Sequence, residues 1–306
     1  MNQYIKRRLF TFIPVIFGVV TAVFLIIHLV PGDPAVLMLG ENAQPADIEN
    51  LRIQLGLNKP LYQQYIEFWG NLFQGDLGIS IYHREPVHNL VWERLPATAT
   101  LALCALIISL IIAFPLGIIS ALYQRKWPDY LALSFSILGI SMPVFWLGPL
   151  LILVFSIYLK ILPVAGLGGW KHLILPSFTL GFGLAAITTR MNRASMIEVL
   201  NQDYIRTARA KGLSEFQMVI RHALKNVLIP VITIVGLQLG ALLGGAIITE
   251  VVFSYPGVGR LLILGILRRD YPLVQGIILI IAIIYLIINL LADIFYAFVD
   301  PRVRLK

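Results

Sequence analysis

Hydrophobic residues run along this chain in six long blocks separated by shorter polar stretches. The blocks fall near residues 9–30, 97–122, 131–159, 173–190, 227–252 and 273–298. A bilayer-spanning helix takes about 20 residues, so every block is long enough to cross, or nearly so. Lipid offers backbone amides no hydrogen-bond partner, and the blocks lack the alternation of barrel strands. The pattern therefore predicts an all-α polytopic membrane protein with six transmembrane helices.

Composition agrees with a membrane location. The chain has 306 residues, of which 58% are hydrophobic and 13% charged, whereas soluble domains average about 25% charged residues. A net charge of +8 could suggest nucleic acid, but no fingerprint of a nucleic-acid-binding module is present. Cys104 is the only cysteine and is interpreted as a small packing residue. The first block has no small-residue cleavage site after it, so we interpret it as a retained span.

The basic residues predict the orientation. With the N-terminus inside, 15 of the 24 Lys and Arg residues lie on the cytoplasmic side, at 6–8, 125–126, 190–225 and 302–306. The loop 31–96 holds eight acidic and four basic residues on the other side. Positive charge favours the cytoplasmic side. We therefore expect a multi-pass protein of the plasma membrane, or of the inner membrane in a diderm organism, with both termini in the cytoplasm.

Four regions follow from this topology. We expect a cytoplasmic N-terminus and first span at 1–30, an extracytoplasmic cap at 31–96, a five-helix core at 97–298, and a cytoplasmic C-terminus at 299–306. Within the cap, Asp33 and Pro34 form an N-cap followed by proline at the first helical position, and residues 62–69 look amphipathic. The cap could contact a delivery protein or brace the first span, and the sequence leaves both open.

Residues 190–230 form the longest polar passage on the basic side. Two capping boxes, Ser195 to Glu198 and Ser214 to Gln217, predict two helix starts. Gly212 lies between them, where glycine permits a left-handed helix end. The sequence thus predicts two short helices meeting at a compact elbow. A basic loop that only sets orientation is the simpler alternative, but such a loop does not need two caps and a glycine.

The predicted elbow has two faces. Its apolar residues fall near one stripe at helical spacing, and its basic residues lie largely off that stripe. One face is expected to pack inward while the other meets a partner. The apolar set is Met196, Val199, Leu200 and Ala208, and the basic set is Arg206, Arg209 and Lys211.

The sequence predicts no catalytic chemistry for this chain. The G-x-S-x-G and H-E-x-x-H patterns are absent, and no facing carboxylates occur in the spans. The dipeptide Gly-Lys does not occur, so a Walker A loop is missing. His83 and His88 lack further ligands nearby and are interpreted as surface residues. The sequence therefore predicts no enzyme, no metal site and no cofactor in this chain.

Two blocks have breaks or small residues that suit a transport pathway. The third contains Pro143 and Pro149, which allow kinks. The fifth has Gly236, Gly240 and Gly244 at four-residue spacing, which strips one helix face of side chains and permits close approach. Packing within the bundle and a moving or intersubunit contact are both possible uses of that stripe. Asp293, an acid inside the last block, is expected to form a salt bridge near the inner boundary.

Several stretches of this sequence resemble one family. Arg206-Thr207-Ala208 and, three residues later, Gly212 look like the "EAA" loop of ATP-binding cassette (ABC) import permeases. Arg206 and Thr207 stand where the general consensus has Glu and Ala. The motifs DYIRTARAKG, RHALKN, PGDPA, LGLNKPLYQQY, GDLGIS, SYPGVGRLL, RRDYPLVQG and ADIFYAFVDPRVR resemble the dipeptide/oligopeptide/nickel import branch and cover nearly the whole chain.

The resemblance implies a type I ABC importer permease fold and a role in coupling. Its loop would dock on a cytoplasmic ATPase through Arg206, Thr207, Ala208, Gly212, Leu213 and Phe216. The implied partners are a second homologous permease subunit, two ATP-binding subunits that hold ATP and Mg, and an extracytoplasmic substrate-binding protein. Peptides are the usual cargo, and nickel complexes and glutathione are alternatives. An ion-coupled secondary transporter is the alternative from another class, although it would need more membrane-embedded acids or internal repeats.

Overall fold

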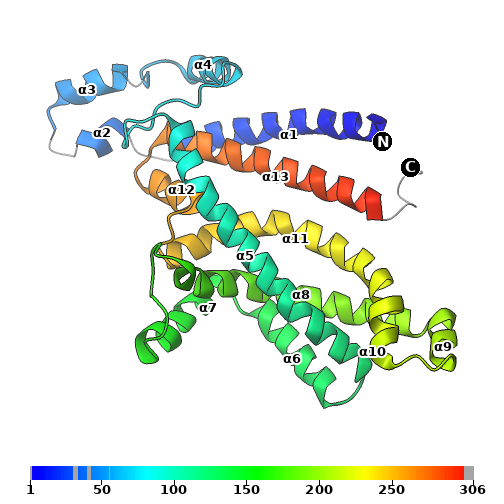
Figure 1. Ribbon diagram of the computed structural model, residues 1–306. Helices are drawn as coiled ribbons and strands as arrows, with labels where there is room; N and C mark the ends of the chain where they lie inside the picture. Colours follow the sequence, from blue (N-terminus) through cyan, green and yellow to red (C-terminus); the bar gives the residue numbers. More distant parts are fainter. Residues whose placement is uncertain (1, 30–33, 40–42, 55, 300–306) are drawn as a thin grey trace. The chain divides into compact units, whose positions relative to one another are not determined.

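The protein is described by a computed structural model that covers residues 2–29, 34–39, 43–54 and 56–299 (Figure 1). Every regular element in these ranges is helical, and the only strand-like pairing there is a single bridge between Ile79 and Pro86. The chain divides into two compact units, Met1–Pro96 with Gly257–Leu286, and Ala97–Pro256 with Ile287–Lys306. Each unit is considered by itself.

The first unit is built on the N-terminal helix α1 (Asn2–Leu29). It also contains α2 (Pro34–Leu39), α3 (Pro45–Gln54), α4 (Leu61–Phe73), α12 (Val258–Leu267) and the first part of α13 (Tyr271–Val299). Aromatic rings join α1 to α4: Phe24 packs edge-on against Tyr65 at 5.1 Å, and Phe17 stacks on Trp69 at 5.4 Å. The amphipathic helix expected at 62–69 is therefore confirmed as α4.

A carboxylate fixes the loop before α5 to the start of α13. Asp270 accepts hydrogen bonds from the Ser80 hydroxyl at 2.5 Å and from the backbone amides of Ile81 and Tyr82 at 3.1 Å. Asp270 also accepts a 3.3 Å hydrogen bond from the Leu273 amide in the first turn of α13. A buried carboxylate with several donors holds its surroundings rigidly. Asp270 thereby anchors the loop, although it follows Ser80 by 190 residues in the sequence.

The second unit is organised around α8 (Trp170–Leu200), which packs against α6 (Trp127–Ser141) and α11 (Leu224–Val252). The approaches are close because small residues meet. A Cβ on Gly181 would lie 2.6 Å from the Ala105 carbonyl of α5 (Val87–Leu122), and one on Gly139 would lie 2.6 Å from the Ala186 Cβ. Small residues in membrane helices permit such backbone approach. The rest of this unit consists of α7 (Val144–Leu151), the π-helical turns η1 (Ile152–Tyr158) and η2 (Val219–Ala223), α9 (Asp203–Ala210) and α10 (Glu215–Met218).

The predicted spans coincide with helices. Four described segments are long and apolar enough to cross a bilayer: Val87–Leu122, Trp170–Leu200, Glu215–Gly240 and Tyr271–Ala292. The bent pair Trp127–Ser141 and Val144–Tyr158 supplies a fifth. The remaining predicted span, 9–30, falls on α1, whose apolar part Phe10–Ile26 is shorter, and position 30 lies outside the described residues.

The second span begins earlier than predicted. Helix α5 starts at Val87, ten residues before the expected start at 97, and continues through Pro96. Its first turns bury Val87, Leu90 and Val91, which are spaced as one helical face. The polar residues between them conceal this amphipathic stretch from a search for continuous apolar runs.

The third span is broken rather than gently kinked. Its two helical segments are bent by 108° at Met142 and Pro143. Pro143 adopts an extended conformation, with φ −67° and ψ 141°, and caps the N-terminus of α7. Proline lacks an amide hydrogen and disfavours a helical conformation in the residue before it. The sequence indicated the position of the break but not its size.

The stretch between the fifth and sixth spans is also more structured than expected. The six-block pattern leaves residues 253–272 as a connection between two spans, but Val258–Leu267 forms the helix α12. Val258, Leu261 and Leu262 are buried on one side of it. A helix of ten residues is too short for a span, and this is why the pattern of long blocks missed it.

Two polar side chains of α11 accept hydrogen bonds from neighbouring helices. Gln238 accepts a 3.1 Å hydrogen bond from the Thr188 hydroxyl, and the buried Glu250 accepts one of 2.6 Å from Thr98. These contacts join α11 to α8 and to α5. The predicted salt bridge of Asp293 involves a side chain outside the described residues.

Candidate functional site

The elbow between α8 and α11 consists of α9, the turn around Gly212, and α10 (Figure 1). Its first predicted start is wrong, because α8 continues through Ser195 and ends at Leu200, and the next helix begins at Asp203. Neither glycine nor proline interrupts α8 between Thr189 and Leu200, and Ser195 is buried on its packed face. A serine with a glutamate three residues later is compatible with a helix interior when packing holds the helix.

The turn at Gly212 has the predicted left-handed conformation, with φ +80°. The Gly212 amide donates to the Arg209 carbonyl at 3.0 Å, and the Leu213 amide donates to the Ala208 carbonyl at 3.4 Å. These two hydrogen bonds form a Schellman motif, in which glycine takes the left-handed position. The sequence prediction for this helix end is confirmed.

The second helix start is confirmed as well. The Ser214 hydroxyl accepts from the Gln217 amide at 3.3 Å, and the Gln217 side chain accepts from the Ser214 amide at 3.4 Å. Arg209 lies across the turn from Glu215, with nitrogen–oxygen distances of 3.0 and 3.4 Å. The turn is thus closed by backbone, capping and ionic contacts together.

An apolar core lies beneath the elbow and binds it to the long helices. Ile205 of α9 packs with Met196 of α8, Met218 of α10 and Val227 of α11, and Ala208 of α9 is also buried. At the same end, the Asn226 amide donates a 2.6 Å hydrogen bond to the Tyr204 hydroxyl, which joins α9 to α11. The elbow therefore moves with α8 and α11, since its inward face is part of their core.

The outer face of the elbow is polar with one large apolar side chain. Arg206 and Thr207 are exposed, and Phe216 of α10 is 76% exposed, whereas Leu213 is half-buried. Ala208 lies on the inward face instead. An exposed phenylalanine beside basic residues on a firmly backed surface is typical of a protein-binding site. Such a surface is better suited to binding a partner protein than to catalysis.

A buried ion pair that we did not predict joins three helices of the second unit. Arg193 of α8 donates to both carboxylate oxygens of Asp129, at 2.6 and 2.8 Å. Asp129 is 1% exposed and accepts further hydrogen bonds from the Ser120 hydroxyl and the Arg125 amide. In the sequence, the only hint of this ion pair is that Asp129 follows the basic residues 125–126. Its partner Arg193 lies 64 residues further along the chain, so the pairing could not be predicted.

The predicted pathway residues are separated in the second unit. Pro143 lies at the break in the third span, and the glycines lie on α11. Gly236 lines an apolar cavity of about 620 Å³ with α5 and α13, and a Cβ there would lie 3.2 Å from that of Ala292. Gly240 is buried, while Gly244 is exposed with open space around it. The stripe therefore serves internal packing at one end and faces outward at the other.

The structure defines a helical membrane protein with an elbow backed by an apolar core between α8 and α11, and sequence comparison gives its class. Residues 113–305 match the family described as "Binding-protein-dependent transport system inner membrane component". Residues 1–102 match the corresponding N-terminal family of membrane components. The chain therefore belongs to the binding-protein-dependent ABC importer permeases.

Curated relatives match over the full length. The chain is 46% identical over 306 residues to the "Glutathione transport system permease protein GsiC" of Escherichia coli O6:H1, with both chains covered completely. It is 45% identical to the protein of the same name from Escherichia coli strain K12, again over both full lengths. These relatives are named as permease proteins of a transport system, in agreement with the family of this chain.

Solved structures share the fold at low identity. A chain of the MetNI methionine ABC transporter in an inward-facing conformation superposes with a TM-score of 0.58 at 17% identity, covering 69% of this chain and 96% of that one. An amino acid ABC transporter solved with histidines gives 0.52 at 16% identity, covering 70% and 94%. The all-helical ABC importer permease fold is thus confirmed for the larger part of the chain.

Proposed function

We propose that this chain is one of two permease subunits of an ATP-driven importer for glutathione or other short peptides. The observation that supports this cargo is the 45–46% identity over the full length to permeases named for glutathione transport. Glutathione is itself a tripeptide, so it belongs to the class of peptide cargo suggested by the sequence motifs. Nickel complexes become the weaker alternative, because these relatives are named for glutathione transport.

The elbow is the proposed contact with an ATPase subunit. Arg206, Thr207, Leu213 and Phe216 would form the contact, while Gly212 sets the direction of α10 relative to α9. Ala208 would support the contact from behind, because it is buried one helical turn after the buried Ile205. A surface that is polar outside and bonded to α8 and α11 inside can transmit a displacement from the partner to the spans.

Transport would follow from two states of the whole assembly. Two ATPase subunits close on ATP, bring the elbows of two permease subunits together, and tilt the spans so that an inward-facing cavity opens outward. ATP hydrolysis resets the assembly. ATP stabilises one arrangement because the contacts differ between the two states. Pro143 and the glycines 236, 240 and 244 are the proposed points where the spans bend or slide.

The proposed architecture completes the topology. Residues 1–30 form the N-terminus and first span, 31–96 the outer cap, 97–298 the core with its coupling loop 191–226, and 299–306 the C-terminus, with both ends in the cytoplasm. The partners are a second, homologous permease, two ATP-binding subunits and an extracytoplasmic substrate-binding protein.

The direct test has two steps. The tagged chain is extracted gently from its native membrane, and its partners are identified by mass spectrometry. Recovery of a second permease and ATPases is expected. The complete set is then expressed in cells that lack other peptide importers, and uptake of labelled glutathione, a dipeptide and nickel is measured. Glutathione uptake above that of the other two is the expected result. A chain that purifies alone and moves cargo without ATP would overturn the proposal.

A further inference from the structure

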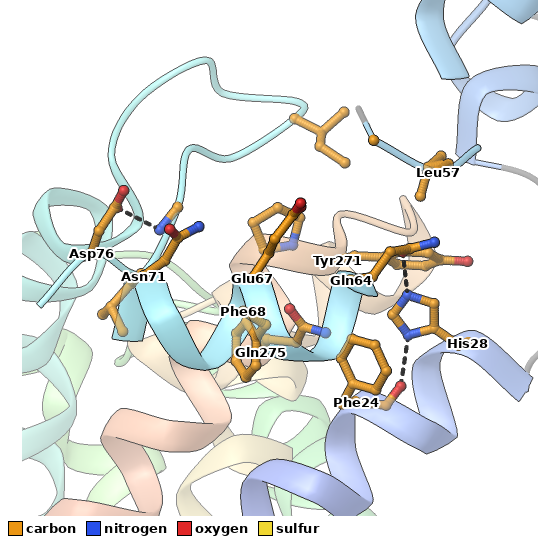
Figure 2. Close-up of a pocket in the computed structure, with 15 residues that line it drawn as sticks. Phe24, His28, Leu57, Gln64, Glu67, Phe68, Asn71, Asp76, Tyr271 and Gln275 are labelled. Atoms are coloured by element: carbon orange, nitrogen blue, oxygen red, sulfur yellow. Dashed lines mark hydrogen bonds between the residues drawn. The ribbon is translucent and has the colours of Figure 1, made fainter. Parts of the chain in front are cut away.

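A cavity of about 200 Å³ with several polar lining residues lies in the first unit (Figure 2). Its walls come from α1, α4, the turn at 56–57, the loop 76–81 and the start of α13. According to the predicted topology it lies at the outer side of the membrane. Nothing in the coupling role proposed above uses it.

The cavity is lined by acids and amides. Glu67 and Asp76 contribute carboxylates, and Gln64, Asn71 and Gln275 contribute amides. No lysine or arginine is among its lining residues within the described chain. Lys59 bonds to the wall from outside, with its ammonium group 2.7 and 2.8 Å from the Glu67 oxygens. That pair is exposed, and exposed ion pairs are weak. The wall therefore favours a positively charged group.

Gln275 presents a polar side chain to this wall. Its side chain is only 8% exposed, and it lines the cavity from α13. Within the described part of the chain, no group forms a hydrogen bond with its amide. The nitrogen and oxygen of this amide are not among the fully buried atoms that lack a partner, so they are accessible from the cavity. The amide oxygen can therefore accept a hydrogen bond from a group that enters the cavity.

Aromatic rings form the floor beside this amide. The His28 ring packs between those of Phe24 and Tyr271, with centroid distances of 4.1 and 5.4 Å. Hydrogen bonds hold His28 in place, at 2.7 Å to the Phe24 carbonyl and 3.1 Å to the Gln64 side chain (Figure 2). Phe24, Phe68 and Tyr271 all line the cavity. Aromatic faces attract cations and also contact the methylene groups that carry them.

The frame of the cavity is rigid. Asp270 fixes the loop at Ser80, Ile81 and Tyr82, and Asp76 accepts a 2.8 Å hydrogen bond from the Gly78 amide. A preformed pocket with few but well-placed polar groups is the usual form of a small-ligand site.

We propose that this cavity binds one primary ammonium or guanidinium group together with a short apolar stem. Gln275 accepts a hydrogen bond from the group, Glu67 and Asp76 supply opposite charge, and the aromatic rings contact the stem. The group has two possible sources: the free amine of a small molecule, or a lysine or arginine side chain of the substrate-binding protein. The proposal does not depend on which cargo is transported.

The first experiment measures binding of a minimal probe. The full-length chain, purified with its partner subunits in lipid nanodiscs, is titrated with n-butylammonium and with neutral n-butanol, and binding is followed by saturation-transfer NMR. The ammonium is expected to bind and the alcohol is not. Gln275→Leu, which keeps the volume but removes the acceptor, is expected to weaken ammonium binding about tenfold.

A second variant separates recognition from folding. Asn71→Asp adds a negative charge at an exposed lining position and is expected to strengthen ammonium binding about threefold. A merely structural role for these residues predicts no gain in ammonium binding in Asn71→Asp. Equal binding of the ammonium and the alcohol, or unchanged ammonium binding in both variants, would overturn the proposal.

The source of the group is decided by a docking measurement. Affinity of the substrate-binding protein for the nanodisc complex is compared between the wild type and the double variant Glu67→Gln, Asp76→Asn. Weaker docking in the variant identifies a side chain of that protein as the occupant. Unchanged docking together with retained ammonium binding by the wild type identifies a free amine.

Discussion

Gly212 controls the direction of the elbow through its backbone conformation alone. Its φ is +80°, and a Cβ built there would have nothing within 4 Å. Any cost of a side chain at this position is therefore conformational and not steric. A left-handed conformation costs an ordinary L-residue about 1–2 kcal/mol, and β-branched residues tolerate it least.

Gly212→Val is expected to lower ATP-dependent transport several-fold while the complex still assembles, because α10 is turned away from its partner. The measurement compares transport and ATP hydrolysis in proteoliposomes. Gly212→Asn is the control, since asparagine tolerates the left-handed conformation, and it should keep most of the activity. Normal coupled transport in the valine variant would contradict the coupling role of this turn.

Asp129 is the residue whose loss should cost the second unit most stability. Removing one partner of a buried ion pair leaves an uncompensated charge and costs about 3 kcal/mol or more. Asp129→Ala is therefore expected to lower the melting temperature of the purified complex clearly, because Arg193 would lose both of its hydrogen bonds.

The control for this prediction is the exposed pair of Asp203 and Arg206, which are 3.5 Å apart. Asp203→Ala should leave the melting temperature almost unchanged, since exposed pairs contribute little. Equal melting temperatures for the Asp129 variant and the wild type would show that the pair is not a structural joint.

At the scale of the element, α9 and α10 form a two-faced unit that allows stability and coupling to be tested separately. Ile205 is fully buried, and Phe216 is 76% exposed. Ile205→Ala is expected to destabilise the protein by about 3 kcal/mol, as core truncations do. Phe216→Ala should leave the melting temperature unchanged but weaken the response of ATP hydrolysis to substrate. Full coupling in the Phe216 variant would remove this side chain from the proposed contact.

Helix α11 offers a second comparison along one stripe. Gly240 is buried, whereas Gly244 is exposed in open space. Gly240→Leu is expected to reduce the yield of folded protein, since close packing at small residues leaves no room for a large side chain. The leucine side chain of Gly244→Leu would not clash with this chain. If this variant loses the second permease from the purified complex, Gly244 is an intersubunit contact. Undiminished recovery would show that it is not.

At the scale of the whole molecule, the orientation in the membrane can be measured with single cysteines. Cys104→Ser removes the one native thiol. In that background, Asn58→Cys should react with a membrane-impermeant maleimide in intact spheroplasts, whereas Lys211→Cys should react only after lysis. Both positions are exposed, so access alone decides the result. The reverse pattern would invert the predicted topology.

Local features of the sequence predicted the elements that depend on neighbouring residues. The long apolar blocks gave the spans, Gly212 gave the left-handed helix end, and Ser214 with Gln217 gave the capping box. Each of these is decided within a few residues by backbone sterics or by the cost of placing amides in lipid. The family was predicted from short motifs that are distributed along nearly the whole chain.

Only the tertiary structure decided the features that join distant residues. Ser195 could cap a helix or continue one, and packing of its face in α8 chose continuation. The pair of Asp129 and Arg193, the 108° bend at Pro143 and the unpaired amide of Gln275 depend on which helices meet. The local sequence limits the conformations and the hydrogen bonds that are available to each residue, whereas the packing of the helices determines which distant residue becomes its partner.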